Sequence, residues 1–144
     1  MRVDFYHLSR DPAPVALAQI AAKALEAGQR MLVVSDDAEQ ASAISDALWA
    51  APGFLANGEA GEHGDARQPI LIAPDAADAP NGARLVALAD GQWRDEALSY
   101  DRALLLFDAQ TIDGARGAWR ALGDSEGVER HYWKFVDGRW VVGP

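Results

Sequence analysis

Two arginines and a tryptophan near the C-terminal end have a spacing that could form a pocket for an anion with an apolar part. Arg116, Trp119 and Arg120 stand at positions i, i+3 and i+4, which share one face of a helix. Guanidinium groups bind carboxylates in a bidentate manner, while an indole ring takes an apolar group. Phe107 or Leu105, at the end of the preceding apolar run, could line the floor. The alternative is that Trp119 belongs to the core and both arginines are only solvated.

A second candidate surface combines Trp49 with Phe54. Trp49 ends an expected helix, and Phe54 follows a Pro52-Gly53 turn in a region that is otherwise polar and rich in glycine. Aromatic side chains displayed at the edge of a loop are favoured anchors of protein interfaces. The alternative is that both rings are tucked under the loop as a small satellite cluster.

The sequence lacks the patterns of nucleotide chemistry. A glycine-rich stretch at 58–65, within a long connection at 51–69, carries acidic residues and has no Lys-Ser/Thr pair of a phosphate-binding loop. Residues 8–12, which follow the first apolar run, contain no glycine, so a dinucleotide-binding fingerprint is absent. We therefore interpret 51–69 as a surface loop and expect no cofactor.

Residues suited to metal or acid–base chemistry are weak candidates. His7, His63 and His131 do not share the spacing of metal ligands, and the chain has no cysteine, so we expect no metal site. Two carboxylate pairs could in principle do acid–base work, namely Asp36 with Asp37 and Asp124 with Glu126. Helix capping and solubility explain these pairs more simply, and no catalytic residue is predicted.

The charge distribution restricts the classes of partner. The chain has a net charge of −9, which disfavours direct, strong binding to nucleic acid. Residues 1–113 carry 8 basic and 18 acidic side chains, whereas residues 114–144 carry 5 basic and 4 acidic ones. Only the C-terminal end therefore favours an acidic ligand. The absence of cysteine, of a long apolar run and of a signal-peptide pattern predicts a cytoplasmic protein without a membrane segment.

Short apolar runs alternate with segments of helical periodicity. The runs expected to form strands are 3–8, 31–34, 70–73, 84–88 and 103–107. Helices are expected from Asp11-Pro12 to Gly28, from Ser35-Asp36-Asp37 to Trp49, and over 113–122. This alternation predicts a three-layer α/β/α sandwich with a mostly parallel sheet, in a single domain over residues 1–144.

Local signals predict two caps and a final hairpin. Asp11 precedes a proline in the manner of a helix cap, and Asp36 with Glu39 has the spacing of a capping box. The tail at 130–144 contains aromatic residues on both sides of Asp137-Gly138, a dipeptide that favours a hairpin turn. We expect this hairpin to pack on the sheet as a C-terminal extension.

Taken in order, several segments resemble the chi subunit of the bacterial DNA polymerase III holoenzyme, an accessory of its clamp loader. The resemblance covers nearly the whole chain. Its segments are the opening Val3–Leu8, the passage Lys23–Val34, the run Asp46-Ala-Leu-Trp49 with Phe54, the glycine-rich loop, Pro69–Ile72, Phe107-Asp108 and Ala115–Leu122. The most specific parts are Ala-Leu-Trp with its Phe and the Arg-x-x-Trp-Arg helix.

The resemblance implies a non-enzymatic adaptor. Chi-like proteins bind the C-terminal tail of the single-stranded-DNA-binding protein, which is acidic and ends in Ile-Pro-Phe with a free carboxylate. By this likeness Trp119 receives the terminal phenylalanine, Arg116 holds its carboxylate, and Arg120 attracts the upstream aspartates. Trp49 and Phe54 match the edge at which relatives meet the psi subunit or a helicase.

Two other classes of function stay open at this point. An enzyme or nucleotide-binding domain would use the crevice at the C-terminal ends of the parallel strands. A purely structural subunit would be held to its partner by Trp49 and Phe54 alone. Nucleotide-dependent stabilisation would support the first class, and loss of a complex on changing Trp49 would support the second.

Overall fold

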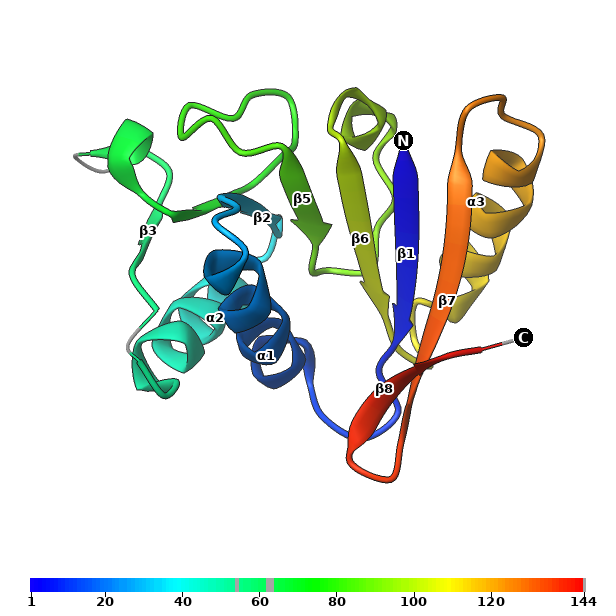
Figure 1. The fold of residues 1–144 in the computed structure, drawn as a ribbon, viewed down its shortest axis with the longest axis horizontal. Coiled ribbons are helices and arrows are strands. Elements are labelled where there is room, and N and C mark those ends of the chain that lie inside the picture. Colours follow the sequence, from blue (N-terminus) through cyan, green and yellow to red (C-terminus); the bar gives the residue numbers. More distant parts are fainter. Residues whose placement is uncertain (54, 62–63, 144) are drawn as a thin grey trace.

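Eight strands form one sheet in the computed structural model, which describes residues 1–53, 55–61 and 64–143 (Figure 1). Across the sheet they follow the order β3-β4-β2-β5-β6-β1-β7-β8. Their bounds are β1 Arg2–His7, β2 Met31–Val34, β3 Asn57–Glu59, β4 Ile70–Ala73, β5 Leu85–Leu88, β6 Arg102–Phe107, β7 Glu129–Val136 and β8 Arg139–Val142. Neighbouring strands pair in parallel, except β7 with β8, which pair antiparallel. The predicted mostly parallel sheet is confirmed.

Helices cover both faces of this sheet. The longer helices are α1 Ala13–Glu26, α2 Ala38–Ala50 and α3 Ile112–Gly123, and short 3-10 turns lie at Asp65–Arg67 and Asp95–Ser99. Buried residues of α1 and α2 pack on one face with side chains such as Tyr6 and Leu104. Those of α3 pack on the other face with side chains such as Phe5 and Leu105. Because successive strand residues point to opposite faces, the apolar strands build two cores, and the three-layer sandwich is confirmed.

The start of α2 differs from the prediction in one detail. The cap is Asp37, whose Oδ1 accepts hydrogen bonds from the backbone amides of Glu39 at 2.9 Å and Gln40 at 3.4 Å. The capping box predicted from Asp36 and Glu39 is wrong, because Asp36 lies one residue outside the cap. The sequence signal for a capped helix is correct, but its register is shifted by one residue.

The start of α1 also differs. Pro12 occupies the cap position and makes no side-chain hydrogen bond there, so the predicted cap at Asp11 is wrong. Pro14 follows inside the first turn, where a missing backbone N–H costs nothing. The prolines therefore begin this helix by restricting the backbone dihedral φ rather than by supplying a side-chain acceptor.

The connection at 51–69 contains structure that the sequence did not predict. β3 lies inside it and pairs in parallel with β4 at the edge of the sheet. Buried Asn57 anchors this strand, because its amide donates to the carbonyl of Leu55 at 2.9 Å and accepts from Ser45 Oγ at 2.6 Å. The other strands are marked by an apolar run, whereas β3 is held by a buried asparagine whose side-chain amide has hydrogen-bond partners.

The C-terminal hairpin is confirmed. Val136 of β7 pairs with Arg139 of β8 across a two-residue turn, in which Asp137 and Gly138 have φ values of 50° and 80°. Positive φ at both positions is the geometry for which an Asp-Gly pair is favoured. β7 pairs in parallel with β1, so the hairpin adds two strands to the sheet on the β1 side.

Candidate protein-interaction site

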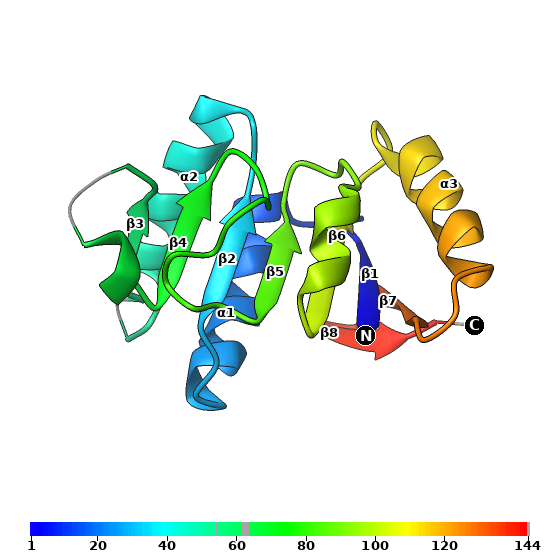
Figure 2. The same ribbon diagram turned by 90° about the horizontal axis from the view of Figure 1, so that it is seen from above.

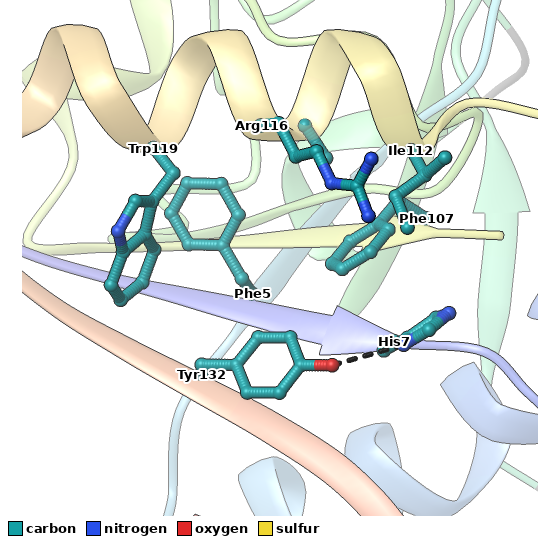
Figure 3. Close-up of a pocket in the computed structure, with 8 residues that line it drawn as sticks. Phe5, His7, Phe107, Ile112, Arg116, Trp119 and Tyr132 are labelled. Atoms are coloured by element: carbon teal, nitrogen blue, oxygen red, sulfur yellow. Dashed lines mark hydrogen bonds between the residues drawn. The ribbon is translucent and has the colours of Figure 1, made fainter. Parts of the chain in front are cut away.

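A cavity of about 330 Å³ opens between α3 and the neighbouring strands β6, β1 and β7 (Figure 3). Its lining is mostly aromatic and aliphatic. The lining residues are Phe5, His7, Phe107, Ile112, Ala115, Arg116, Trp119 and Tyr132. A cavity of this size lies at the lower end of the range of about 300–1,000 Å³ that is usual for ligand pockets.

Strand register brings the floor of the cavity together. Phe107 on β6 pairs with His7 on β1, and Phe5 on β1 pairs with Tyr132 on β7. These residues lie on the α3 face of the sheet, because each alternates with a residue that points to the α1 face. Three strands distant in the sequence therefore supply one aromatic floor.

Trp119 forms one wall of the cavity and is held from two sides. Its ring meets Phe5 edge-on, with centroids 5.1 Å apart and an interplanar angle of 77°. The guanidinium of Arg130 lies 4.2 Å from the centroid of the Trp119 ring. Arg130 Nη1 also donates a hydrogen bond of 2.6 Å to the backbone carbonyl of Trp119. The indole is therefore partly buried and fixed in orientation, and it still borders the cavity.

Arg116 supplies the positive charge of the cavity. Its guanidinium projects from α3 over the ring of Phe107 (Figure 3). Its ion pair with Asp113 has an Nη1–Oδ1 distance of 3.9 Å, and both side chains are largely exposed. An exposed pair at that distance contributes little, so the guanidinium of Arg116 is available to another carboxylate.

His7 and Tyr132 close the side of the cavity opposite α3. The His7 ring stacks on Phe107 with centroids 5.0 Å apart, and His7 Nδ1 lies 3.0 Å from the Tyr132 hydroxyl. The lining contains no aspartate or glutamate among the residues that the structure describes. The site thus offers one cation and polar ring atoms within an apolar enclosure, which suits an apolar group that carries a negative charge.

The residues predicted from the helix spacing do not all meet at this cavity. Phe107, Arg116 and Trp119 line it. Leu105 lies fully buried beneath it, and Arg120 is exposed outside the lining. The guanidinium that contacts the indole belongs to Arg130. Because Arg130 lies on β7, helical spacing within α3 could not predict this contact.

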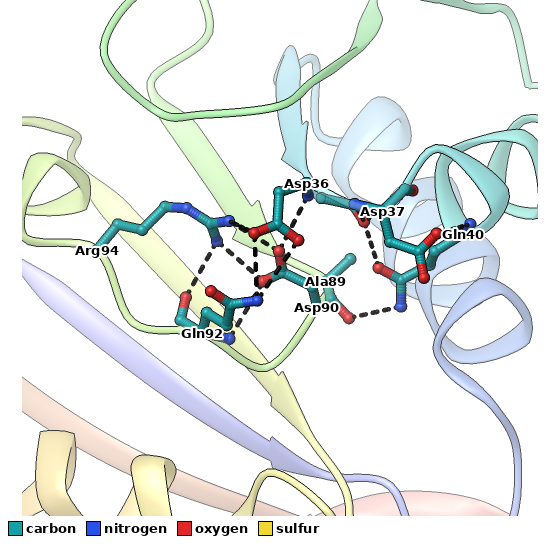
Figure 4. Close-up of polar contacts among 8 residues, drawn as sticks. Asp36, Asp37, Gln40, Ala89, Asp90, Gln92 and Arg94 are labelled. Carbon is teal, nitrogen blue, oxygen red and sulfur yellow. Dashed lines mark hydrogen bonds and ion pairs between the residues drawn. The ribbon is translucent and has the colours of Figure 1, made fainter.

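The C-terminal ends of β2 and β5, where an α/β sheet often binds nucleotides, carry a different arrangement (Figure 4). Arg94 forms an ion pair of 2.7 Å with Asp90 and lies 3.7 Å from Asp36. Burial raises the pKa of the Asp90 carboxyl, but hydrogen bonds from Arg94 and from the backbone amides of Asp36 and Gln92 outweigh it and lower that pKa. Arg94 thus contacts both the Asp36 and the Asp90 carboxylates, and the Asp37 carboxylate caps α2. This geometry favours a structural role for Asp36 and Asp37.

Within residues 1–53, 55–61 and 64–143, no three His, Cys, Asp or Glu side chains gather as a metal site would require. His7 borders the cavity, His131 lies on β7, and His63 lies outside the described residues. Over the same ranges, no helix has both the length and the apolar character that crossing a membrane requires.

The family model described as DNA polymerase III chi subunit, HolC, matches residues 1–130. The chain belongs to this family. A comparison with curated proteins finds no match. The chi family is an accessory component of the DNA polymerase III holoenzyme, so the resemblance noted in the sequence is confirmed. The matched range includes every lining residue of the cavity except Tyr132.

The second predicted surface of this chi-family protein lies far from the cavity. Trp49 is 48% exposed in the last turn of α2, and α2 and α3 lie toward opposite ends of the sheet (Figure 2). Phe54 lies outside the described residues. The structure therefore displays the Trp49 ring to solvent, on a helix that packs on the opposite face of the sheet from the α3 cavity.

Sequence reasoning missed most of the cavity floor. Phe5, His7 and Tyr132 have no helical spacing relative to Arg116, so nothing along the chain associates them. Strand alternation was the signal available for Phe5, since it stands on the opposite face from Tyr6. Knowledge of the strand order was still needed to place β1 between β6 and β7.

Proposed function

We propose that this chi-family protein is a non-catalytic replisome adaptor of the cytoplasm, acting as a single domain over residues 1–144 without a cofactor. In this proposal it binds the acidic C-terminal tail of the single-stranded-DNA-binding protein and so links the clamp loader to coated template. One observation carries the proposal. The α3 cavity combines an aromatic enclosure with the available guanidinium of Arg116 and has no acidic residue in its described lining.

The chemistry of the cavity suits a terminal phenylalanine. Its phenyl ring would enter the cavity beside Trp119 and lie over the aromatic floor, where Phe107 and Phe5 offer apolar contacts. The free carboxylate would accept hydrogen bonds from Arg116, whose bond to Asp113 is long and exposed. Arg120, exposed outside the lining, would attract the aspartates upstream of the terminus.

The expected affinity follows from the burial of one phenylalanine, hydrogen bonds to a carboxylate and the ordering of a flexible tail. Burial of one phenylalanine contributes about 1.5–3 kcal/mol. Hydrogen bonds to a charged group contribute roughly 1.5–3 kcal/mol each. Ordering a flexible tail takes back much of this sum. A dissociation constant on the order of micromolar, near −8 kcal/mol, is the result we expect.

The Trp49 ring, together with Phe54, is the second part of the proposal. We expect this edge to bind another protein of the replication machinery, either the psi subunit of the clamp loader or a helicase. Its support is the solvent-exposed indole at the end of α2. Since this edge lies away from the α3 cavity, both partners could be held at once (Figure 2).

A pair of peptides tests the tail-binding proposal. A fluorescent peptide ending in Asp-Ile-Pro-Phe is titrated in the free-acid form and in the amidated form, and binding is followed by anisotropy. Amidation and Arg116→Ala should each weaken binding at least about tenfold, which is about 1.4 kcal/mol. Arg67→Ala, which removes the same charge from an exposed residue remote from α3, is the matched control. Equal binding of both peptides would show that the proposed pocket is not the site.

A further inference from the structure

A second and larger cavity, of about 850 Å³, lies on the opposite face of the sheet from the α3 cavity. One wall is α1, with Gln19, Ile20 and Lys23. The other wall is the β7–β8 hairpin. Between them the floor is formed by β1 and the neighbouring strands, over a part of the sheet that no helix covers in Figure 1. Parallel sheets are normally covered on both faces, so this groove is an opening in the usual packing.

Four cationic side chains line this groove in a chain whose net charge is −9. Arg2 and Arg102 share the fully buried carboxylate of Asp4, with ion-pair distances of 2.9 Å and 2.7 Å. Lys23 and Arg139 form no ion pair within the described part of the chain, and both are exposed. No aspartate or glutamate is among the described lining residues. The groove therefore has an excess of three positive charges over the single carboxylate beneath it.

The hairpin side of the groove is an aromatic wall. Tyr6 stacks on Trp133 with centroids 5.8 Å apart, and Trp140 meets Tyr6 edge-on at 5.1 Å. Phe135 in turn contacts Trp140 edge-on at 5.2 Å. Trp133 Nε1 donates a hydrogen bond of 2.7 Å to Asp4, which ties the wall to the same carboxylate as the cations. The apolar wall and the positive floor are thus one connected structure.

All of this wall except Tyr6 lies beyond the part of the chain that the family match covers. The match ends at residue 130, whereas Trp133, Phe135, Arg139 and Trp140 follow it. The groove is therefore formed jointly by the matched strands and helix and by a hairpin outside the matched range.

We propose that the groove binds an extended acidic segment of a partner protein, in which carboxylate and apolar side chains alternate. An extended chain points successive side chains to opposite sides. Carboxylates on one side would meet Lys23, Arg102 and Arg139, while apolar side chains on the other would lie against the aromatic wall. The inference does not depend on tail binding at α3, because the two cavities lie on opposite faces of the sheet.

Single-stranded nucleic acid fits the groove less well. The aromatic rings pack against one another, so they form a continuous wall rather than separate platforms for stacked bases. A nucleic acid strand also carries a charge at every phosphate and would continue past the groove. The net charge of −9 of the chain would disfavour that continuation. A short acidic peptide places its few charges within the groove alone.

A synthetic probe tests the proposal on the full chain. The probe is a fluorescent, amidated peptide in which aspartate and leucine alternate over about eight residues, roughly 26 Å when extended. Saturable binding at low salt is expected, with chemical-shift changes at the indole N–H signals of Trp133 and Trp140 and none at that of Trp119. A peptide with lysine in place of aspartate should not bind.

Matched charge reversals locate the site. Lys23→Glu and Arg139→Glu should each weaken binding of the probe at least about tenfold. Arg67→Glu makes the same change in net charge at an exposed position elsewhere, and Arg116→Ala alters only the α3 cavity, so both should leave binding unchanged. Unaltered melting temperatures will show that the variants fold.

Three results would overturn the proposal. The first is no saturable binding of the aspartate–leucine probe at millimolar concentration. The second is equal weakening by Arg67→Glu, which would indicate nonspecific attraction. The third is tighter binding of an oligothymidine that is lost in Arg139→Glu, which would assign the groove to nucleic acid instead.

Discussion

The guanidinium of Arg130 lies 4.2 Å from the ring centroid of Trp119 and donates a hydrogen bond of 2.6 Å to the Trp119 carbonyl. A single side chain of β7 thereby holds both the ring and the backbone of the helix residue that walls the cavity. The contact also fixes the last two turns of α3 against β7. The cavity thus depends on a strand residue as much as on the helix.

Removal of Arg130 should therefore loosen Trp119. We expect Arg130→Ala to lower the free energy of unfolding by about 1–3 kcal/mol, through loss of the cation–π contact and of the hydrogen bond. The tail peptide should bind more weakly as well, because the indole is no longer fixed. Urea unfolding and peptide anisotropy measure both effects. Lys134→Ala, which removes a charge from an exposed residue of the same strand, is the control, and equal effects of the two variants would contradict this account.

Arg120 should act at a distance rather than by direct contact with the terminal residue. It is exposed and outside the cavity lining, so Arg120→Ala should weaken tail binding only about two- to fivefold at low salt, in line with roughly 0.2–1 kcal/mol for exposed charge pairs. The effect should vanish at high salt because screening removes it. Arg116→Ala should weaken binding at both salt concentrations. A large loss that persists at high salt for Arg120→Ala would place Arg120 in the pocket itself.

The buried carboxylate of Asp4 should make stability depend on pH. Burial raises the pKa of Asp4, but hydrogen bonds from Arg2, Trp133 and Arg102 outweigh it, so the pKa lies below its ordinary value of about 3.9. The unfolded chain then binds this proton more readily than the folded one. The stabilisation by Asp4 is therefore complete above the ordinary pKa and is lost as the pH falls through the lower, folded-state value.

Replacement of Asp4 tests this dependence. Asp4→Asn should lower the free energy of unfolding at neutral pH by roughly 1.5–3 kcal/mol and flatten its decline in acid. Denaturant unfolding at a series of pH values measures both. Asp101→Asn is the matched control, because Asp101 also accepts hydrogen bonds from an arginine, Arg84, but both side chains are exposed. An acid dependence that is unchanged in Asp4→Asn would assign it to other groups.

Gly91 should resist substitution for a reason beyond its backbone conformation. Its φ is 76°, and a Cβ there would lie 2.5 Å from Thr111 Oγ1, directly before α3. Gly28 has the same φ of 76° with no atom within 4 Å of a Cβ. Gly28→Ala should therefore lower the free energy of unfolding by only about 1–2 kcal/mol, which is the cost of placing a Cβ in the left-handed backbone conformation. Gly91→Ala should lower the free energy of unfolding further, because the added Cβ also collides with Thr111. Equal melting temperatures of the two variants would contradict this steric explanation.

Trp49 should matter for a partner and little for the fold. Because its ring is 48% exposed, Trp49→Ala should change the free energy of unfolding by about 1 kcal/mol or less. Binding of the tail peptide should be unchanged, while complex formation with purified psi subunit or helicase should be lost. Size-exclusion chromatography measures the complex. Retention of both partners by Trp49→Ala would remove this edge from the proposal.

Periodicity and turn chemistry were sufficient for most elements. The runs at 31–34 and 70–73 coincide with β2 and β4, because a strand buried on both faces must be apolar throughout. The Asp137-Gly138 turn was predictable because few residue pairs tolerate positive φ at both positions. β3 was missed because its residues, Asn57–Glu59, are polar and are stabilised by a side-chain hydrogen bond that only the folded chain supplies.

The sequence alone determined the alternation of helices and strands, the family of the chain and the shared face of Arg116 and Trp119, since each depends on spacing along one segment. Tertiary structure decided which strands lie side by side, and with them the aromatic floor beneath α3. It also decided that Arg130 contacts Trp119 while Arg120 does not. The physical reason is that a parallel sheet joins residues more than a hundred positions apart, as in the pairing of Phe5 with Tyr132, and no local pattern records such a pairing.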